Sequence, residues 1–400
     1  MRHWPLPQPW STVALSLATS LCLLLTAALP GCGGVDSGGT GQTVENPTAS
    51  AGPITGFGSI IVNGIRYDES RASIVDDDGV THPPSDLRLG MVVEVQGSVR
   101  GGTTEGTASR IQFGQEISGP VNSVNVSGSS LVVLGQTVQV DDGTLFGGFG
   151  GGLSTVAPGQ LADVYGFQDP VSGSYTATRI ERRASLTRYV LRGTLGNLAG
   201  PPVRNFSIGT ATIDYSTVAP QALPTLSNGL RVRVTLNTTP VSGRWVATSV
   251  RTSQYSFPDN SEAKVEGFVS SFTSRSDFLV AGVRVDASAP GLIVRHGTVA
   301  DLANGVRVRI EGEMRAGVLV ADVLDFKRGR REEFELHGPV ETLSVGSQTL
   351  VLRGMTVRWD GDTRFTGGRV SDLAEGVRVE VRGSAAGTQV LAESIRFERP

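Results

Sequence analysis

The chain has 400 residues, 35 of them basic and 38 acidic, which gives a formal net charge of −3 at pH 7. Because there is no basic excess to neutralise phosphates, the composition argues against nucleic-acid binding. The length exceeds that of one small domain, so we expect several domains.

The first 31 residues have the features of an export signal. Arg2 is their only Lys or Arg, and residues 13–29 form an uncharged run that is too short for a comfortable membrane span. The run ends in Leu29-Pro30-Gly31-Cys32, which resembles the lipobox of bacterial lipoproteins. The resemblance implies that residues 1–31 are removed and that the thiol of Cys32 takes a diacylglycerol. An ordinary signal peptide followed by a chance cysteine is the alternative.

The cysteine count also favours a lipid anchor. Cys22 lies in the segment that would be removed, so the exported chain would keep Cys32 alone and could form no internal disulfide. Gly33, which stands where an aspartate would act as a retention signal, resembles the sorting pattern for the outer membrane. We therefore expect a lipid anchor in the outer membrane, with the protein facing the periplasm or the cell surface. Residues 32–52 are predicted to form a flexible tether, because few of them are large and apolar.

A hydrophobic alternation that ends at an aspartate occurs five times, first as Ile65-Arg66-Tyr67-Asp68. The five aspartates are 72 to 74 residues apart, at Asp68, Asp141, Asp214, Asp286 and Asp360. A glycine before the next alternating strand follows nearly the same period, at Gly90, Gly159, Gly229, Gly305 and Gly376. A period this regular predicts five copies of one small module, with any function spread over a repeated surface.

Each module is predicted to contain five strands. In the fourth copy, two short strands flank Ala281-Gly282 as a tight hairpin, and Asn63-Gly64 occupies the same turn in the first copy. A short helical turn, closed by the left-handed landmark glycine, lies between the third and fourth strands. This order predicts an all-β protein of tandem OB-like barrels, each with its own core, and a two-sheet sandwich is the alternative. The modules are assigned to residues 53–115, 116–184, 188–254, 262–327 and 333–400, with a bend at residues 253–263.

The repeated string resembles an uncharacterised bacterial domain family, DUF5666. It combines an opening glycine, the aspartate hairpin, the landmark glycine and a closing Ala-x-x-Ile-x-Phe, as in Ala108 to Phe113. The opening glycines are assigned to Gly56, Gly119, Gly193, Gly267 and Gly338. The third module has Leu236 where the others have glycine, so we expect its fourth strand to lack the bulge inferred in the other copies. The resemblance implies exported lipoproteins built of such modules and implies no known activity.

Two sets of side chains are candidate functional residues. The five repeated aspartates either end their strands by accepting hydrogen bonds from the next turn or bind calcium, which prefers several oxygen ligands. Tyr67, Phe278 and Trp359 are candidate stacking residues, because OB-like barrels bind chains across strands two and three. Packing in the core is the alternative for these aromatic rings. We assign no metal and no cofactor.

No catalytic motif stands out in the sequence. His82, His296 and His337 occupy unrelated module positions, and neither H-E-x-x-H nor G-x-S-x-G occurs. The sequence therefore favours a non-enzymatic envelope lipoprotein that acts as a repeated binding or scaffold array for protein or glycan partners. A calcium-dependent module array and a cryptic envelope hydrolase are the alternatives, and the hydrolase would need a deep cleft lined by a carboxylate or a histidine.

Overall fold

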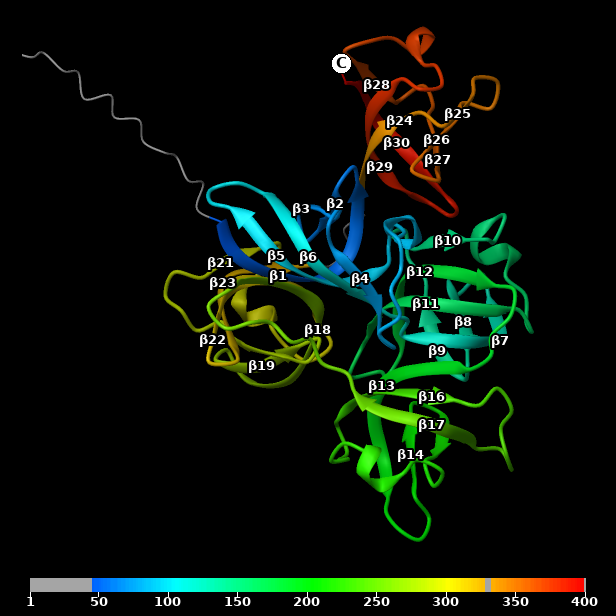
Figure 1. Ribbon diagram of the computed structural model, residues 1–400, viewed down its shortest axis with the longest axis vertical. Coiled ribbons are helices and arrows are strands. Elements are labelled where there is room, and N and C mark those ends of the chain that lie inside the picture. The colour runs from blue at the N-terminus through cyan, green and yellow to red at the C-terminus, as the bar shows by residue number, and fades with distance from the viewer. Residues whose placement is uncertain (1–44, 328–331, 399–400) are drawn as a thin grey trace, which may run out of the picture. The chain divides into compact units, whose positions relative to one another are not determined.

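A computed structural model describes residues 45–327 and 332–398 of the chain (Figure 1). Over these ranges the regular structure is β-strand, interrupted by short 3-10 turns, so the predicted all-β class is confirmed. Within the same ranges, no helix has the length and apolarity needed to cross a membrane. The predicted signal peptide, Cys32 and the first part of the tether lie outside the described residues.

The first barrel shows how each strand circuit closes. β1 (Glu45–Phe57) pairs with β2 (Ile60–Val62), which pairs with β3 (Ile65–Asp68), both in antiparallel fashion. β3 then runs parallel to β6 (Glu105–Phe113), and β5 (Val92–Arg100) lies antiparallel to both β6 and β1. The strands therefore pair in the order first, second, third, fifth, fourth and back to the first. This closed circuit has no free edge and is the strand order of an OB-like barrel.

The same circuit recurs along the chain, and we number the barrels 1 to 5 in sequence order. Barrel 2 consists of β7 (Ile117–Asn125), β8 (Ser130–Val133), β9 (Gln136–Gln139), β11 (Leu161–Gln168) and β12 (Tyr175–Arg183). Barrel 3 consists of β13 (Tyr189–Ala199), β14 (Asn205–Ile208), β15 (Ala211–Asp214), β16 (Arg231–Leu236) and β17 (Trp245–Thr252).

Barrels 4 and 5 complete the series. Barrel 4 consists of β18 (Glu262–Ser274), β19 (Asp277–Val280), β20 (Val283–Asp286), β22 (Arg307–Arg315) and β23 (Val318–Phe326). In barrel 5 the opening strand is split into β24 (Glu333–Pro339) and β25 (Thr342–Ser344), followed by β26 (Thr349–Leu352), β27 (Met355–Arg358), β29 (Arg378–Ala386) and β30 (Gln389–Phe397).

Short elements connect the third and fourth strands of each circuit. Each of the five barrels has a 3-10 turn here, as predicted, at Pro84–Asp86, Gly152–Thr155, Pro220–Ala222, Val299–Asp301 and Val370–Asp372. All but barrel 3 also have an extra strand, parallel to the last one, which the sequence did not predict. These strands are β4 (Ser73–Asp76), β10 (Leu145–Gly147), β21 (Ile293–Arg295) and β28 (Arg364–Thr366).

The landmark glycines follow these turns in the left-handed region, as predicted. Gly90 has φ +80°, and its N–H donates a 2.8 Å hydrogen bond to the Ile54 carbonyl. The equivalent glycines donate to Val121, Leu195, Val269 and Val340. In each of these four barrels the acceptor lies two residues after the opening glycine, so Gly52 is the equivalent glycine in barrel 1. The assignment of Gly56 is thereby corrected.

The expected loss of the bulge in barrel 3 is also corrected. The β16–β17 ladder shifts register between Thr235 and Leu236, just as the β5–β6 ladder shifts between Gln96 and Gly97. The shift arises because β17 carries one extra residue, Thr248, between the partners of Thr235 and Leu236. The number of residues in the partner strand therefore sets the bulge, and glycine is not required.

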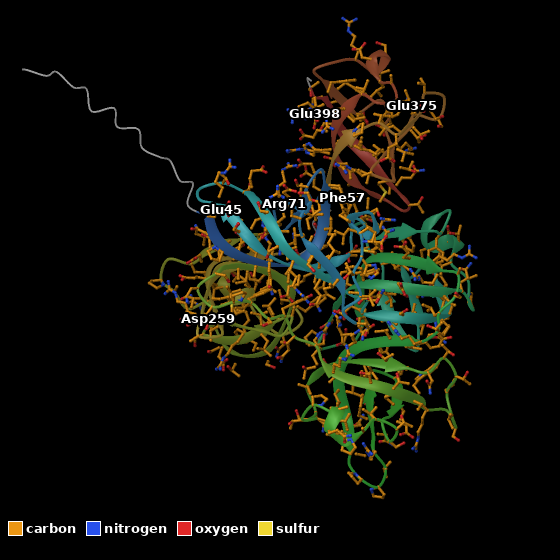
Figure 2. All side chains as sticks on the ribbon, viewed as in Figure 1. Glu45, Phe57, Arg71, Asp259, Glu375 and Glu398 are labelled. Atoms are coloured by element: carbon orange, nitrogen blue, oxygen red, sulfur yellow. The ribbon has the colours of Figure 1, made fainter. Side chains whose placement is uncertain are left out.

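Opening strands also pair between barrels, so the expected row of separately cored modules is corrected. Residues 48–51 of β1 run parallel to residues 262–265 of β18, and Gly56 and Phe57 pair with β24 (Figure 1; Figure 2 labels Phe57). β7 also pairs with β13, but in antiparallel fashion. Buried apolar side chains of barrels 1 and 5 form one cluster, and those of barrels 2 and 3 form another. The barrels are therefore fused side by side through their first strands.

The predicted tether ends earlier than expected. Residues 45–52 form the first part of β1, and Ala49 and Ala51 are fully buried in the core of barrel 4. Small side chains, which in the sequence resemble a linker, here allow β1 to approach β18 closely. Residues 32–44, the rest of the predicted tether, lie outside the described residues.

Candidate functional site

The repeated aspartates end their strands with a common hydrogen bond. A carboxylate oxygen of each accepts the backbone N–H two residues later, at 2.8 to 3.0 Å, and the donors are Ser70, Gly143, Ser216, Ser288 and Asp362. For Asp68, the backbone N–H and then the hydroxyl of Ser70 hold the pKa below its usual value, and for Asp214 the hydroxyl and then the backbone N–H of Ser216 do so. The geometry is that of an Asx turn, in which the carboxylate substitutes for a backbone carbonyl.

One group of potential metal ligands, Glu335, His337 and Glu380, comes together among the described residues. It contains none of the repeated aspartates. Arg66 and Arg382 pair with Glu335, and Arg396 pairs with Glu380, so guanidinium groups already compensate these carboxylates. We assign no metal to this group.

The candidate stacking aromatics do not form a ligand face. Tyr67, Phe278 and Trp359 are 0 %, 1 % and 3 % exposed, respectively. Tyr67 and Trp359 belong to the core of barrels 1 and 5, and Phe278 belongs to that of barrel 4. The strand alternation directs these rings inward, so core packing, the alternative interpretation, describes them.

A cleft of about 440 Å³ lies where barrels 1 to 4 meet. Its volume falls within the range of about 300–1,000 Å³ that is usual for small-ligand sites. Its walls combine aromatic rings with charged and amide side chains. Prominent lining residues are Asp77, Glu94, Phe113, Glu116, Phe167, Gln168, Arg192, Arg231, Arg233, Arg251, Tyr255 and Phe268.

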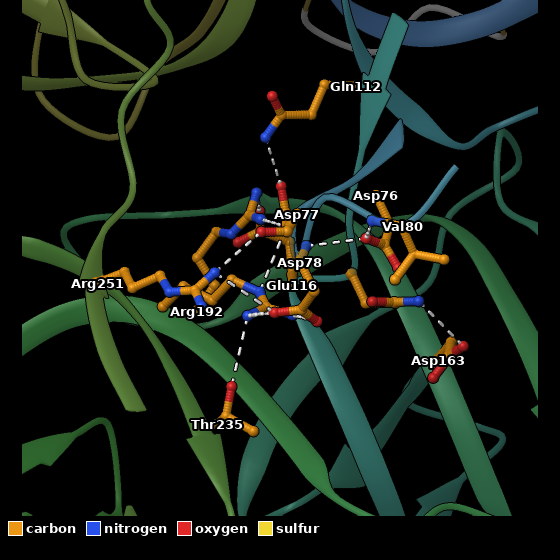
Figure 3. Close-up of polar contacts among 12 residues, drawn as sticks. Asp76, Asp77, Asp78, Val80, Gln112, Glu116, Asp163, Arg192, Thr235 and Arg251 are labelled. Atoms are coloured by element: carbon orange, nitrogen blue, oxygen red, sulfur yellow. Dashed lines mark hydrogen bonds and ion pairs between the residues drawn. The ribbon is translucent and has the colours of Figure 1, made fainter. Parts of the chain in front are cut away.

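The loop after β4 supplies the acidic residues at one end of this cleft. Oδ1 of Asp76 accepts the N–H groups of Asp78 and Val80, both at 2.9 Å (Figure 3). Gly79 has φ +80° and lets the chain turn back tightly. Because Asp76 holds the turn, the carboxylates of Asp77 and Asp78 are free to point toward barrel 3.

Both carboxylates pair with arginines of barrel 3. Asp78 accepts two hydrogen bonds from Arg233, at 3.0 and 2.8 Å, and one from Arg188 at 2.6 Å. Asp77 pairs with Arg192 and accepts a 3.1 Å hydrogen bond from Gln112 (Figure 3). Burial would raise the pKa of Asp78, but the pairing with Arg233 outweighs it and lowers the pKa below its usual value.

Glu116 extends the network from the segment before β7. It is 4 % exposed and pairs with Arg192 at 3.4 Å and with Arg231 at 2.5 Å. Burial would lower the pKa of Arg192, but the carboxylates of Asp77 and Glu116 raise it above its usual value. Barrels 1 and 2 therefore supply the counter-charges for arginines of barrel 3, and we call these ion pairs the arginine clasp.

Comparison with barrel 4 explains why barrel 3 needs outside partners. In barrel 4, Arg309 lies opposite Glu266 on one neighbouring strand and Asp325 on the other. The corresponding ladders of barrel 3 place Arg233 opposite Arg192 and Arg251.

Where barrel 4 has Glu266 and Asp325, barrel 3 has Arg192 and Arg251. One face of barrel 3 therefore carries adjacent positive charges and has no carboxylate at these two positions. Such a face is stable only if another part of the chain neutralises it. The arginine clasp of Asp77, Asp78 and Glu116 supplies that neutralisation.

The remaining wall comes from barrel 1 and from the segment predicted to be a bend. Burial raises the pKa of the Glu94 carboxyl, although Gln96 donates a 3.0 Å hydrogen bond to it. Tyr255 stacks on Phe257 with a ring-centroid distance of 6.1 Å, and burial raises the pKa of its hydroxyl. The predicted bend is therefore packed against the barrels and contributes to the cleft.

Sequence reasoning did not identify the cleft. One usable signal was the run Arg231-Val232-Arg233. The equivalent strand of barrel 4 lies between strands that carry acidic residues, whereas the neighbouring strands of barrel 3 carry arginines. A second signal was Tyr255 and Phe257, two aromatic residues beside Pro258 in a segment otherwise typical of a linker.

Comparison with protein-family models gives one match, to DUF5666, described as a domain of unknown function. The matched segments are residues 51–112, 118–181, 266–324 and 337–396, which together span more than half of the chain. The chain belongs to this family. No curated protein matches it.

The DUF5666 matches coincide with barrels 1, 2, 4 and 5, which confirms tandem DUF5666 domains. Barrel 3 lies between the second and third matched segments. It is also the barrel with Leu236 at the bulge and the arginine face, so its departures from the DUF5666 pattern coincide with its role in the clasp.

Proposed function

We propose that the chain is a non-enzymatic, lipid-anchored envelope protein that binds a glycan in the cleft where barrels 1 to 4 meet. The observation that supports binding is the cleft itself, in which aromatic rings lie beside closely spaced arginine, carboxylate and amide groups. A sugar fits this combination of groups in two ways. Its C–H face packs on aromatic rings, and its hydroxyls form hydrogen bonds with planar polar groups.

The proposal includes two finer points about the chain. Barrel 3 is a diverged fifth copy of the DUF5666 module, because its strand circuit and its glycine-to-carbonyl bond match those of the other four. Cys32 carries the lipid and holds the protein in the outer membrane, on the sequence grounds given above. We expect Cys32→Ala to release the protein from membranes and to remove a diacylglycerol mass from its N-terminal peptide.

Binding to an array of immobilised oligosaccharides tests the glycan assignment. We expect the full chain, purified in detergent, to bind a subset of the glycans, and Tyr255→Ala to reduce that binding at least tenfold. Phe365→Ala is the matched control, because Phe365 is also a partly buried aromatic residue but packs against barrel 5. Binding of no glycan, or equal loss in both variants, would contradict the assignment. Binding of an envelope protein instead would favour the scaffold role.

An envelope hydrolase is the second candidate, favoured by the raised pKa of Glu94 in a cleft that also contains Asp77. A protonated carboxylic acid beside a carboxylate is the pair that glycoside hydrolysis uses. Asp77 is engaged by Arg192 and Arg233, however, so its carboxylate is not free to act on a substrate. Release of reducing ends from a bound glycan, lost in Glu94→Gln, would favour the hydrolase over the binding protein.

A further inference from the structure

The arginine clasp leaves hydrogen-bond donors without acceptors. Arg192 is 8 % exposed and Arg233 is 6 % exposed, yet the Nε–H of each is buried with no hydrogen-bond partner among the described residues. Nε of Arg233 lies 3.4 Å from Oδ2 of Asp77 without forming a hydrogen bond. Both arginines line the cleft. A buried donor without a partner is unfavourable, so an acceptor supplied by a ligand would be favoured here.

Tyr255 adds a hydroxyl to the same cleft. Its side chain lines the cleft, and its hydroxyl can donate a hydrogen bond to a ligand. The two buried groups of the cleft that lack a partner are both donors, so the ligand atoms that would match them are acceptors.

The charges around the cleft point the same way. Four arginines line it, Arg192, Arg231, Arg233 and Arg251, and their carboxylate partners include Asp77, Asp78 and Glu116. A guanidinium group bonds an anionic oxygen more strongly than a neutral one, so an anionic acceptor fits this wall better than a neutral acceptor.

A second hollow, of about 530 Å³, lacks these features. It is lined by Arg88, Arg179 and Arg353 among others. Arg179 bonds Glu181 at 2.8 Å and the Leu89 carbonyl at 3.2 Å, and Arg353 bonds the His337 carbonyl at 3.2 Å. No buried side-chain donor without a partner is found among the described residues of its wall. Two further buried Nε–H groups without a partner, those of Arg307 and Arg309, lie in barrel 4 outside both hollows. The unmatched donors thus distinguish the first cleft from the second hollow.

We infer that the glycan bound in the cleft carries an anionic oxygen group, a carboxylate or a phosphate, which Arg192, Arg233 and Tyr255 hold. The inference rests on the proposed glycan-binding function and names the chemical class of the ligand. The anionic group occupies the arginine side of the cleft, and the neutral part of the sugar packs on the partly exposed ring of Phe268. Arg251, at the open edge, adds a further positive charge.

Calorimetry with paired probes tests this inference on the full chain in detergent. The first pair is a galacturonic acid trimer and its methyl ester, and the second is maltotriose phosphate and maltotriose. Each pair differs in the charged group while the sugar stays the same. We expect at least one acid to bind at least tenfold more tightly than its neutral partner, and the pair that shows the difference identifies carboxylate or phosphate as the source.

Variants place the anion within the cleft. Arg192→Gln would remove one buried partner from both Asp77 and Glu116 and is prone to unfold, so Arg251→Gln and Tyr255→Phe are the informative changes. We expect each to weaken binding of the preferred acid at least fivefold. Arg284→Gln is the control, since the side chains of Arg251 and Arg284 are 56 % and 59 % exposed and Arg284 lies outside the cleft wall. Binding of the control variant should not change.

The outcomes separate the two proposals. Equal affinity for acid and neutral probe would overturn the anionic ligand and leave glycan binding in place. Tight binding of an acid that neither Arg251→Gln nor Tyr255→Phe weakens would overturn its placement in the cleft. No binding of any of the four probes, together with no binding on the glycan array, would overturn both.

Discussion

Asp78 and Arg233, 155 positions apart in the chain, form a bidentate ion pair with N–O distances of 3.0 and 2.8 Å. The pair joins the loop after β4 of barrel 1 to the fourth strand of barrel 3. Barrel 3 cannot neutralise its own arginine face, so this contact couples the charge balance of one barrel to the position of another. The cleft exists because that coupling brings barrels 1 and 3 together.

Replacement of Asp78 by Asn should destabilise the fold substantially. The side chain of Arg233 is 6 % exposed and would remain charged without its main partner. Removal of one member of a buried ion pair typically costs about 3 kcal/mol. Urea unfolding followed by fluorescence should show a loss of this size. Asp322→Asn, at an exposed site on β23, should change the free energy of unfolding by less than about 0.5 kcal/mol. Equal effects of the two changes would contradict a structural role for the clasp.

Two landmark glycines should differ in their tolerance of alanine. Gly90 and Gly159 both have positive φ, so alanine at either position costs about 1 kcal/mol in backbone strain. A Cβ at Gly90 would also lie 2.5 Å from the Thr178 carbonyl oxygen of barrel 2, whereas nothing lies within 4 Å of one at Gly159. Gly90→Ala should therefore cost about 2–4 kcal/mol. Thermal unfolding of both variants measures the difference, and equal losses would argue against close contact of barrels 1 and 2.

The module pattern was accessible from the sequence because it depends on local alternation. Hydrophobic periodicity marks the face of each strand that turns into its own barrel, and Asn63-Gly64 or Ala281-Gly282 marks the hairpin. The interior positions of Tyr67 and Trp359 follow the same alternation, which is why core packing describes them better than a ligand face.

The fusion of barrels was not accessible in the same way. Which strand pairs with the free side of β1 depends on residues about 200 positions away, and Ala49-Ser50-Ala51 resembles a linker because its small side chains carry no periodic signal. The cleft could not be predicted for the same reason, because its residues come from four barrels. The repeats themselves offered one route, because comparison of Arg192 with Glu266 reveals an arginine where a sister module has its acid.

Glu94→Gln should raise stability at neutral pH more than at acidic pH. Burial raises the pKa of Glu94 in the folded protein above its value of 4.5 in the unfolded chain. The favourable contribution of the protonated group is complete below pH 4.5 and is lost as the pH rises through the folded-state pKa. Glutamine cannot ionise and avoids that loss.

The melting temperature of Glu94→Gln minus that of the parent should therefore be more positive at pH 7 than at pH 4. Differential scanning calorimetry at the two pH values measures it. Glu393→Gln, at an exposed site on β30, should show no such pH dependence. If the melting-temperature difference between Glu94→Gln and the parent is the same at both pH values, Glu94 is not a buried carboxyl with a raised pKa.

Calcium should not stabilise the protein through its repeated aspartates. Oδ1 of Asp360 accepts the N–H of Asp362 at 3.0 Å and the hydroxyl of Thr363 at 3.5 Å, so it is already used by the turn. Asp360→Ala should cost about 1 kcal/mol with or without calcium. Thermal shift measurements with calcium and with a chelator test this. A calcium-dependent rise in melting temperature that Asp360→Ala abolishes would restore the calcium-array alternative.

Hydrogen–deuterium exchange of the full chain, with and without its tightest-binding acidic glycan, tests most directly whether the junction of barrels 1 to 4 is the ligand site. We predict slower exchange on ligand addition in peptides that contain Glu94 and residues 251–255, and no change in peptides of barrel 5. Protection confined to barrel 5, or no change anywhere at saturating ligand, would contradict it.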